Sequence, residues 1–133
     1  MAASAFGHIH HVGIACRDIH RTRAWVCETF PVTADSGVVH DPVQDADLCL
    51  LDIEDQLAFE LVSGPMVEGM LRRKNSYYHV CYEADEITDA ISHFEAHGSR
   101  LISGPVPAVL FDGRPVAFLL SPIGLVEVLG SSR

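Results

Sequence analysis

Basic residues are scarce in this chain of 133 residues: nine Lys and Arg stand against 18 Asp and Glu, a formal net charge of −9. Proteins that bind nucleic acid neutralise phosphates, so this balance argues against a nucleic-acid partner. Long apolar runs are also missing, since Pro115–Leu120 is among the longest and is far too short to span a bilayer. The N-terminus has neither the basic start nor the apolar stretch of a signal peptide. The sequence therefore predicts a cytoplasmic protein that does not bind membranes.

Cysteine is limited to four residues with no C-x-x-C pair among them: Cys16, Cys27, Cys49 and Cys81. In a cytoplasmic chain such residues are expected to be reduced and mostly buried. Hydrophobic residues make up 48% of the chain and charged residues 20%, which excludes a disordered chain. A chain of this length buries about two-thirds of its surface on folding and needs no disulfide. We expect a single domain over residues 1–133.

Two pairs of segments repeat each other along the chain. His11–Ile19 resembles His79–Ile87 at an offset of 68 residues, and Ala58–Val62 resembles Leu125–Leu129 at an offset of 67 residues. Two separate matches at almost the same offset indicate two copies of a single unit. Each copy begins with a strand that carries a His and ends with a strand that carries a Glu.

The local patterns predict the same order of elements in both copies. In the first, Asp18 caps a helix that Pro31 stops; in the second, Asp85 caps a helix that Gly98 stops. Strands are expected over residues 8–16, 32–39, 47–53 and 57–62, and again after the linker, over residues 100–103, 114–120 and 124–129. The order βαβββ, occurring twice, predicts an α+β fold. Its parts are module 1 over about residues 6–63, a linker over residues 64–75 and module 2 over about residues 76–130.

Strand alternation places a His or a Glu of each copy on the face away from the helix. Taken singly, a strand His is more often a surface residue, and a single strand Glu more often faces solvent. The recurrence in register favours a shared site, because two such modules side by side would bring four residues together: His11, Glu60, His79 and Glu127. Two imidazoles and two carboxylates form a mixed N/O set that suits one divalent ion of Zn, Ni, Co, Mn or Fe.

The motifs around these residues resemble the vicinal oxygen chelate superfamily. That group includes glyoxalase I, methylmalonyl-CoA epimerase, extradiol dioxygenases, and fosfomycin and bleomycin resistance proteins. The resemblance covers nearly the whole chain, is strongest for the epimerase-like branch, and rests on His11-Val-Gly-Ile-Ala, Ala58-Phe-Glu-Leu-Val, His79-Val-Cys-Tyr-Glu-Ala-Asp and Leu125-Val-Glu-Val-Leu. It implies two βαβββ modules that form an open, barrel-like mixed sheet around a metal cleft. It also implies metal-ligand roles at the same four positions.

The resemblance further implies a metal-dependent isomerase, epimerase or lyase that acts on a small carbonyl substrate through an enolate. An acyl-CoA thioester is one such substrate. A carboxylate beside the metal would move the proton α to the carbonyl, and Glu127 is the expected base. Asp47 and Cys49 are candidates for a second acid–base group on the opposite face of the substrate. The basic and aromatic segment Met70–Tyr78 is expected to meet either solvent or an anionic or thioester-bearing substrate.

Two other functions compete with this one. A small-molecule binding or resistance module of the same fold would have no turnover, but such a protein has no need of two His and two Glu. A metal-dependent oxygenase usually uses two His and one carboxylate with open positions, so the fourth ligand counts against it. Small two-module relatives commonly pair, and uncovered sheet edges invite pairing, so a homodimer is expected.

Overall fold

The computed structural model describes residues 7–131 of the chain. The chain divides into two compact units. His11–Tyr78 is here called the N-terminal unit, and residues 7–10 together with residues 79–131 are called the C-terminal unit. Among the described residues, no helix has both the length and the apolar character that crossing a membrane requires.

The N-terminal unit contains one long helix and a small mixed sheet. Its elements are β1 (Ile9–Ala15, which begins two residues before the unit boundary), α1 (Ile19–Thr29), β2 (Val32–Asp35), β3 (Val39–Asp41), β4 (Ala46–Ile53), β5 (Ala58–Ser63), the 3-10 turn η2 (Pro65–Val67) and α2 (Glu68–Arg72). The strand order is β2-β4-β5-β1, with β3 also beside β4. β1 and β5 are parallel, whereas the other pairs are antiparallel. The strand expected over residues 32–39 is two short strands, because the chain turns at Gly37, where φ is +75°.

The C-terminal unit repeats the βαβββ order. It contains β6 (Tyr77–Ala84, which begins in the N-terminal unit), α3 (Ile87–Ala96), β7 (Arg100–Pro107), β8 (Pro115–Ser121) and β9 (Gly124–Gly130). Its strand order is β6-β9-β8-β7, with β6 and β9 parallel and the remaining pairs antiparallel. The α+β class and the two βαβββ modules are thus confirmed. β7 runs four residues beyond the expected end at residue 103, because its pairing with β8 continues through an irregular register to Pro107.

The ends of the two long helices follow local signals in the sequence. The carboxylate of Asp18 accepts a hydrogen bond from the backbone N–H of Arg21 at 3.2 Å, which confirms the predicted cap of α1. The prediction of Asp85 as the cap of α3 is wrong, because Glu86 holds the extended backbone conformation that precedes the helix. Gly98 follows α3 with φ at +93°, a conformation that glycine adopts without strain, so it ends this helix as predicted.

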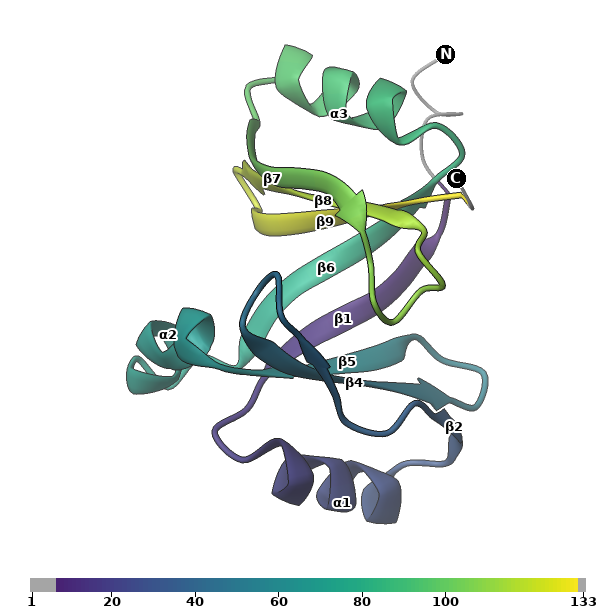
Figure 1. The fold of residues 1–133 in the computed structure, drawn as a ribbon, viewed down its shortest axis with the longest axis vertical. Helices are drawn as coiled ribbons and strands as arrows, with labels where there is room; N and C mark the ends of the chain where they lie inside the picture. Colours follow the sequence, from purple (N-terminus) through teal and green to yellow (C-terminus); the bar gives the residue numbers. More distant parts are fainter. Residues whose placement is uncertain (1–6, 132–133) are drawn as a thin grey trace. The chain divides into compact units, whose positions relative to one another are not determined.

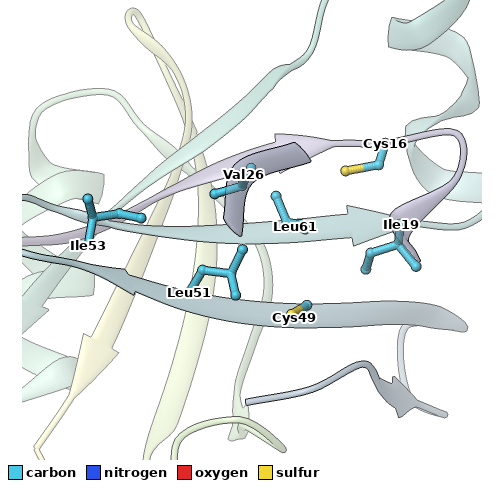
Figure 2. Close-up of a cluster of buried hydrophobic side chains, with 7 residues drawn as sticks. All are labelled: Cys16, Ile19, Val26, Cys49, Leu51, Ile53 and Leu61. Carbon is cyan, nitrogen blue, oxygen red and sulfur yellow. The ribbon is translucent and has the colours of Figure 1, made fainter. Parts of the chain in front are cut away.

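Each long helix packs on one face of the sheet in its own unit, α1 over β4 and β5, and α3 over β7, β8 and β9 (Figure 1). The core under α1, drawn in Figure 2, consists of Cys16, Ile19, Val26, Cys49, Leu51, Ile53 and Leu61. The core under α3 consists of Ala84, Ala90, Ile91, Ala117, Leu119 and Val128. Because strand side chains alternate, Glu60 beside Leu61 points to the face away from α1, and Glu127 beside Val128 points away from α3.

Gly64 joins β5 to η2 in a backbone conformation that residues with a side chain rarely adopt. Its φ is +148°, and a Cβ there would lie 2.8 Å from the backbone carbonyl oxygen of Asp45. We expect Gly64→Ala to lower the free energy of unfolding by about 1–3 kcal/mol, measured by urea denaturation. Gly37→Ala is the matched control, since Gly37 also has positive φ but nothing lies within 4 Å of its Cβ position. Equal losses in the two variants would contradict the role of the backbone contact.

Candidate functional site

In the N-terminal unit, His11 and Glu60 form a buried pair. Nε2 of His11 lies 3.5 Å from Oε1 of Glu60. The His is fully buried and the Glu is 5% exposed. The parallel register of β1 and β5 produces this contact, because it sets Gly13 opposite Glu60 and leaves His11 two residues away on the same face.

In the C-terminal unit, His79 and Glu127 form the equivalent pair. Nε2 of His79 lies 3.1 Å from Oε1 of Glu127, and both side chains are buried. The register is the same as in the other unit, since Cys81, two residues after His79, stands opposite Glu127. The two pairs therefore share the same strand register as well as similar sequences.

Phe118 packs against the imidazole of His79. It lies opposite Glu127 in the β8–β9 ladder, and its ring meets the His79 ring edge to face with centroids 5.3 Å apart. In the N-terminal unit the corresponding position, opposite Glu60, is Leu50. The sequence reasoning did not identify Phe118 as part of the site. The register of the β8–β9 hairpin is the signal that could have found it.

Each pair offers one imidazole nitrogen and one carboxylate oxygen to a ligand. A carboxylate removed from water costs free energy unless donors or a cation compensate its charge. A protonated imidazole is one such compensation, and a divalent ion is another. Nitrogen and oxygen donors of this kind match the ligands of Zn, Ni, Co, Mn and Fe, so the residues fit the metal that the resemblance implies.

The structure does not bring Cys49 to the face of Glu60. On β4, Leu50 stands opposite Glu60, whereas Cys49 stands opposite Leu61 and lies in the core under α1 (Figure 2). Burial, together with the negative charge of Asp35, raises the pKa of the Cys49 thiol to about 11. The thiol is therefore protonated near neutral pH, a poor state for an acid–base group that must exchange protons there.

Asp47 shares the face of Cys49 and is likewise turned away from Glu60. It stands opposite Ser63 in the ladder, and its carboxylate lies 2.9 Å from Nδ1 of His40. On the Glu60 face, the first half of β4 presents Ala46, Leu48 and Leu50, none of which can transfer a proton. The position of Asp47 gives no support to the role of second acid–base group.

We expect Cys49→Ala to leave the catalysed rate within about twofold of the wild type while lowering the free energy of unfolding by about 0.5–3 kcal/mol. The reason is that Cys49 belongs to the packed core and not to the His–Glu face. Thermal unfolding and the proton-exchange assay described below measure the two effects. Cys27→Ala is the control, because Cys27 is the exposed one among the four free cysteines. A loss of rate beyond tenfold in Cys49→Ala alone would return Cys49 to the site.

Comparison with known proteins shows which proteins this chain is similar to. The family model of the glyoxalase/bleomycin resistance protein/dioxygenase superfamily matches residues 10–118. This span contains His11, Glu60 and His79 and ends before Glu127. An ethylmalonyl-CoA/methylmalonyl-CoA epimerase of Cereibacter sphaeroides is 27% identical over 119 residues, which cover 85% of this chain and 87% of that protein.

Solved structures share the fold over nearly the whole chain. Methylmalonyl-CoA epimerase from Mycobacterium tuberculosis superposes with a TM-score of 0.82 at 15% identity, covering 100% of this chain and 93% of that one. A variant of Streptomyces coelicolor methylmalonyl-CoA epimerase, in complex with 2-nitronate-propionyl-CoA, gives a TM-score of 0.74 at 21% identity. That match covers 96% of this chain and 99% of the other.

Proposed function

The chain belongs to the glyoxalase/bleomycin resistance protein/dioxygenase superfamily, and we propose that within it the protein is a metal-dependent isomerase of the epimerase type. Its substrate is an acyl-CoA thioester, and its reaction moves the proton on the carbon next to the carbonyl. The observation that carries this proposal is the buried His–Glu contact that recurs in the same register in both units. The relatives support the substrate class, since one acts as an ethylmalonyl-CoA/methylmalonyl-CoA epimerase and a structural neighbour carries an acyl-CoA analogue.

The proposal assigns one divalent ion to the two pairs together, with His11, Glu60, His79 and Glu127 as its ligands. The burial of both carboxylates supports this assignment, because a cation compensates their charge where water does not reach. When bound, the ion supplies Lewis-acid stabilisation of the negative charge that develops on the carbonyl oxygen of the substrate.

Glu127 is the proposed base. Its carboxylate accepts the proton from the α carbon of the substrate and returns a proton to the same carbon. Phe118 and His79 position this carboxylate, because the Phe118 ring fixes the imidazole whose Nε2 lies 3.1 Å from Oε1 of Glu127. A base held this way needs little reorganisation when the proton moves.

A specific observation favours a second candidate function, isomerisation on one face of the substrate as in glyoxalase I. Inversion of a carbon centre needs an acid–base group on each face of the substrate. The first half of β4 presents Ala46, Leu48 and Leu50 on the face of Glu60, so this half of the strand supplies no such group there. With one base, the enzyme exchanges the α proton without inverting the centre, or isomerises a hemithioacetal.

Proton exchange distinguishes these functions. Metal-loaded protein is incubated in D₂O with methylmalonyl-CoA or with a hemithioacetal, and NMR follows the α position. Exchange with inversion of methylmalonyl-CoA supports the epimerase, and conversion of the hemithioacetal supports the one-base isomerase. If fully metallated protein gives neither exchange nor turnover with either substrate, the protein is a binding module without turnover.

The proposal also includes a cytoplasmic homodimer, and the four free thiols agree with a reducing compartment. β7 stands at the edge of its sheet, where Ile102 and Val106 are exposed. Exposed apolar edge strands favour pairing with another chain. We expect light scattering at about 10–50 μM protein, a working range for weak association, to give twice the 14.5 kDa mass of one chain. A monomer over that range would contradict the dimer.

A further inference from the structure

A cavity of about 320 Å³ opens in the N-terminal unit near the ends of β1 and β5. The residues that line it are Cys16, Arg17, Gly64, Glu68, Leu71 and Arg72. They come from the connection between β1 and α1 and from the segment that contains η2 and α2. Nη2 of Arg17 donates a hydrogen bond to the carbonyl oxygen of Leu71 at 3.2 Å, which ties the two walls together.

This cavity gathers positive charge in an acidic chain. Two of the nine Lys and Arg, Arg17 and Arg72, line it, and two more, Arg73 and Lys74, follow Arg72 in the sequence. Across residues 7–131 none of these four forms an ion pair, whereas Arg23 pairs with Asp35 at 2.7 Å and Arg114 pairs with Glu83 at 3.0 Å. The one carboxylate in the lining, Glu68, leaves a net positive wall.

Helix stability alone does not explain why arginines occupy these positions. Arg72 in the last turn of α2 complements the helix dipole, but Arg17 precedes the N-cap of α1, at the positive end of that helix. Nη2 of Arg72 and Nη1 of Arg73 both lie 3.8 Å from the position that a Cβ would take on Gly69. Both residues are exposed, so their guanidinium groups can donate hydrogen bonds to an anion from solution.

We propose, on the basis of the acyl-CoA substrate proposed above, that this cavity binds the phosphate groups of the coenzyme A moiety. Guanidinium groups bind phosphate oxygens in pairs of parallel hydrogen bonds, which suits arginine better than lysine for this task. Arg17 follows His11 by six residues, and a strand rise of about 3.3 Å per residue places them at most about 20 Å apart along the chain. The long pantetheine arm of coenzyme A spans such a separation, so phosphates at Arg17 leave the thioester near His11.

Calorimetric titration of metal-loaded protein with coenzyme A and with pantetheine tests the cavity. The wild type is expected to bind coenzyme A at least about tenfold more tightly than pantetheine, since one charge-assisted hydrogen bond contributes roughly a factor of ten to the affinity. Arg17→Ala and Arg72→Ala each weaken coenzyme A binding about tenfold and leave pantetheine binding unchanged. Arg100→Ala is the matched control, because Arg100 is an exposed arginine on β7 and is not among the residues that line the cavity.

Equal affinity for coenzyme A and pantetheine in the wild type would overturn the proposal, and so would an equal effect of all three variants. Binding of inorganic pyrophosphate without binding of coenzyme A would overturn it as well, because it would indicate a site for free anions. Proton exchange with a pantetheine thioester separates this proposal from the proposed function. If the protein catalyses proton exchange but its binding of coenzyme A does not depend on the arginines, only the cavity proposal is wrong. If binding depends on the arginines but no exchange occurs, only the proposed function is wrong.

Discussion

Glu127→Gln is expected to slow exchange of the α proton by about 10²–10⁴-fold, the usual contribution of general acid–base catalysis, while the divalent ion stays bound. The amide keeps the size of the carboxylate and an oxygen that can ligate a metal, but it cannot accept the proton. NMR in D₂O measures the exchange, and elemental analysis of the same sample measures the metal.

The chain contains its own control for this variant. Glu60→Gln makes the same chemical change at the equivalent register position of the N-terminal unit. If Glu127 alone is the base, Glu60→Gln retains most of the exchange rate per bound ion. Equal losses of rate in the two variants, with the metal retained in both, would contradict the assignment of the base to Glu127.

The second large effect is expected from His79→Ala, which should release most of the bound divalent ion. Wild-type protein is expected to hold about one ion per proposed site, because two imidazoles and two carboxylates satisfy a transition metal. An ion that binds only the folded state at 100 times its dissociation constant adds about 2.7 kcal/mol of stability, so the wild type also gains thermal stability from the metal and the variant does not.

Elemental analysis and thermal unfolding with and without the ion measure these effects. His79→Gln keeps more of the side-chain volume and should lose the metal as well, which separates ligand loss from a packing defect. His20→Ala, on the exposed side of α1, should change neither measurement. If wild-type protein takes up no more Zn, Ni, Co or Mn than His79→Ala, the metal site does not exist.

Most of the fold could be predicted from the sequence because its signals are local. The capping side chain of Asp18 and the positive φ of Gly98 act within one helical turn, and the repeat of the His and Glu motifs depends only on strand alternation. The α3 cap was missed by one residue because Asp85 and Glu86 are adjacent acids and only the backbone conformation distinguishes them.

Other parts of the candidate site depend on packing that no local pattern specifies. Alternation predicts that Asp47 and Cys49 share a face, but not which face of the sheet it is. The row Cys49, Leu51 and Ile53 is apolar at every second residue, and in the structure this row forms the core under α1. The cavity beside Arg17 was not predicted, because it arises where α2 folds back against the end of β1.

The parallel pairing of β1 with β5 and of β6 with β9 joins residues that are far apart in the sequence, and it therefore affects when each His–Glu pair can form. His11 and Glu60 are 49 residues apart in the sequence, and His79 and Glu127 are 48 residues apart. A contact across such a distance costs the chain the entropy of closing a long loop. The antiparallel hairpins β4–β5 and β8–β9 are local and need no such closure. A nascent chain that still lacks β5 or β9 therefore has no His–Glu pair of that module to offer a metal ion, and each half of the site is complete only when its own module is.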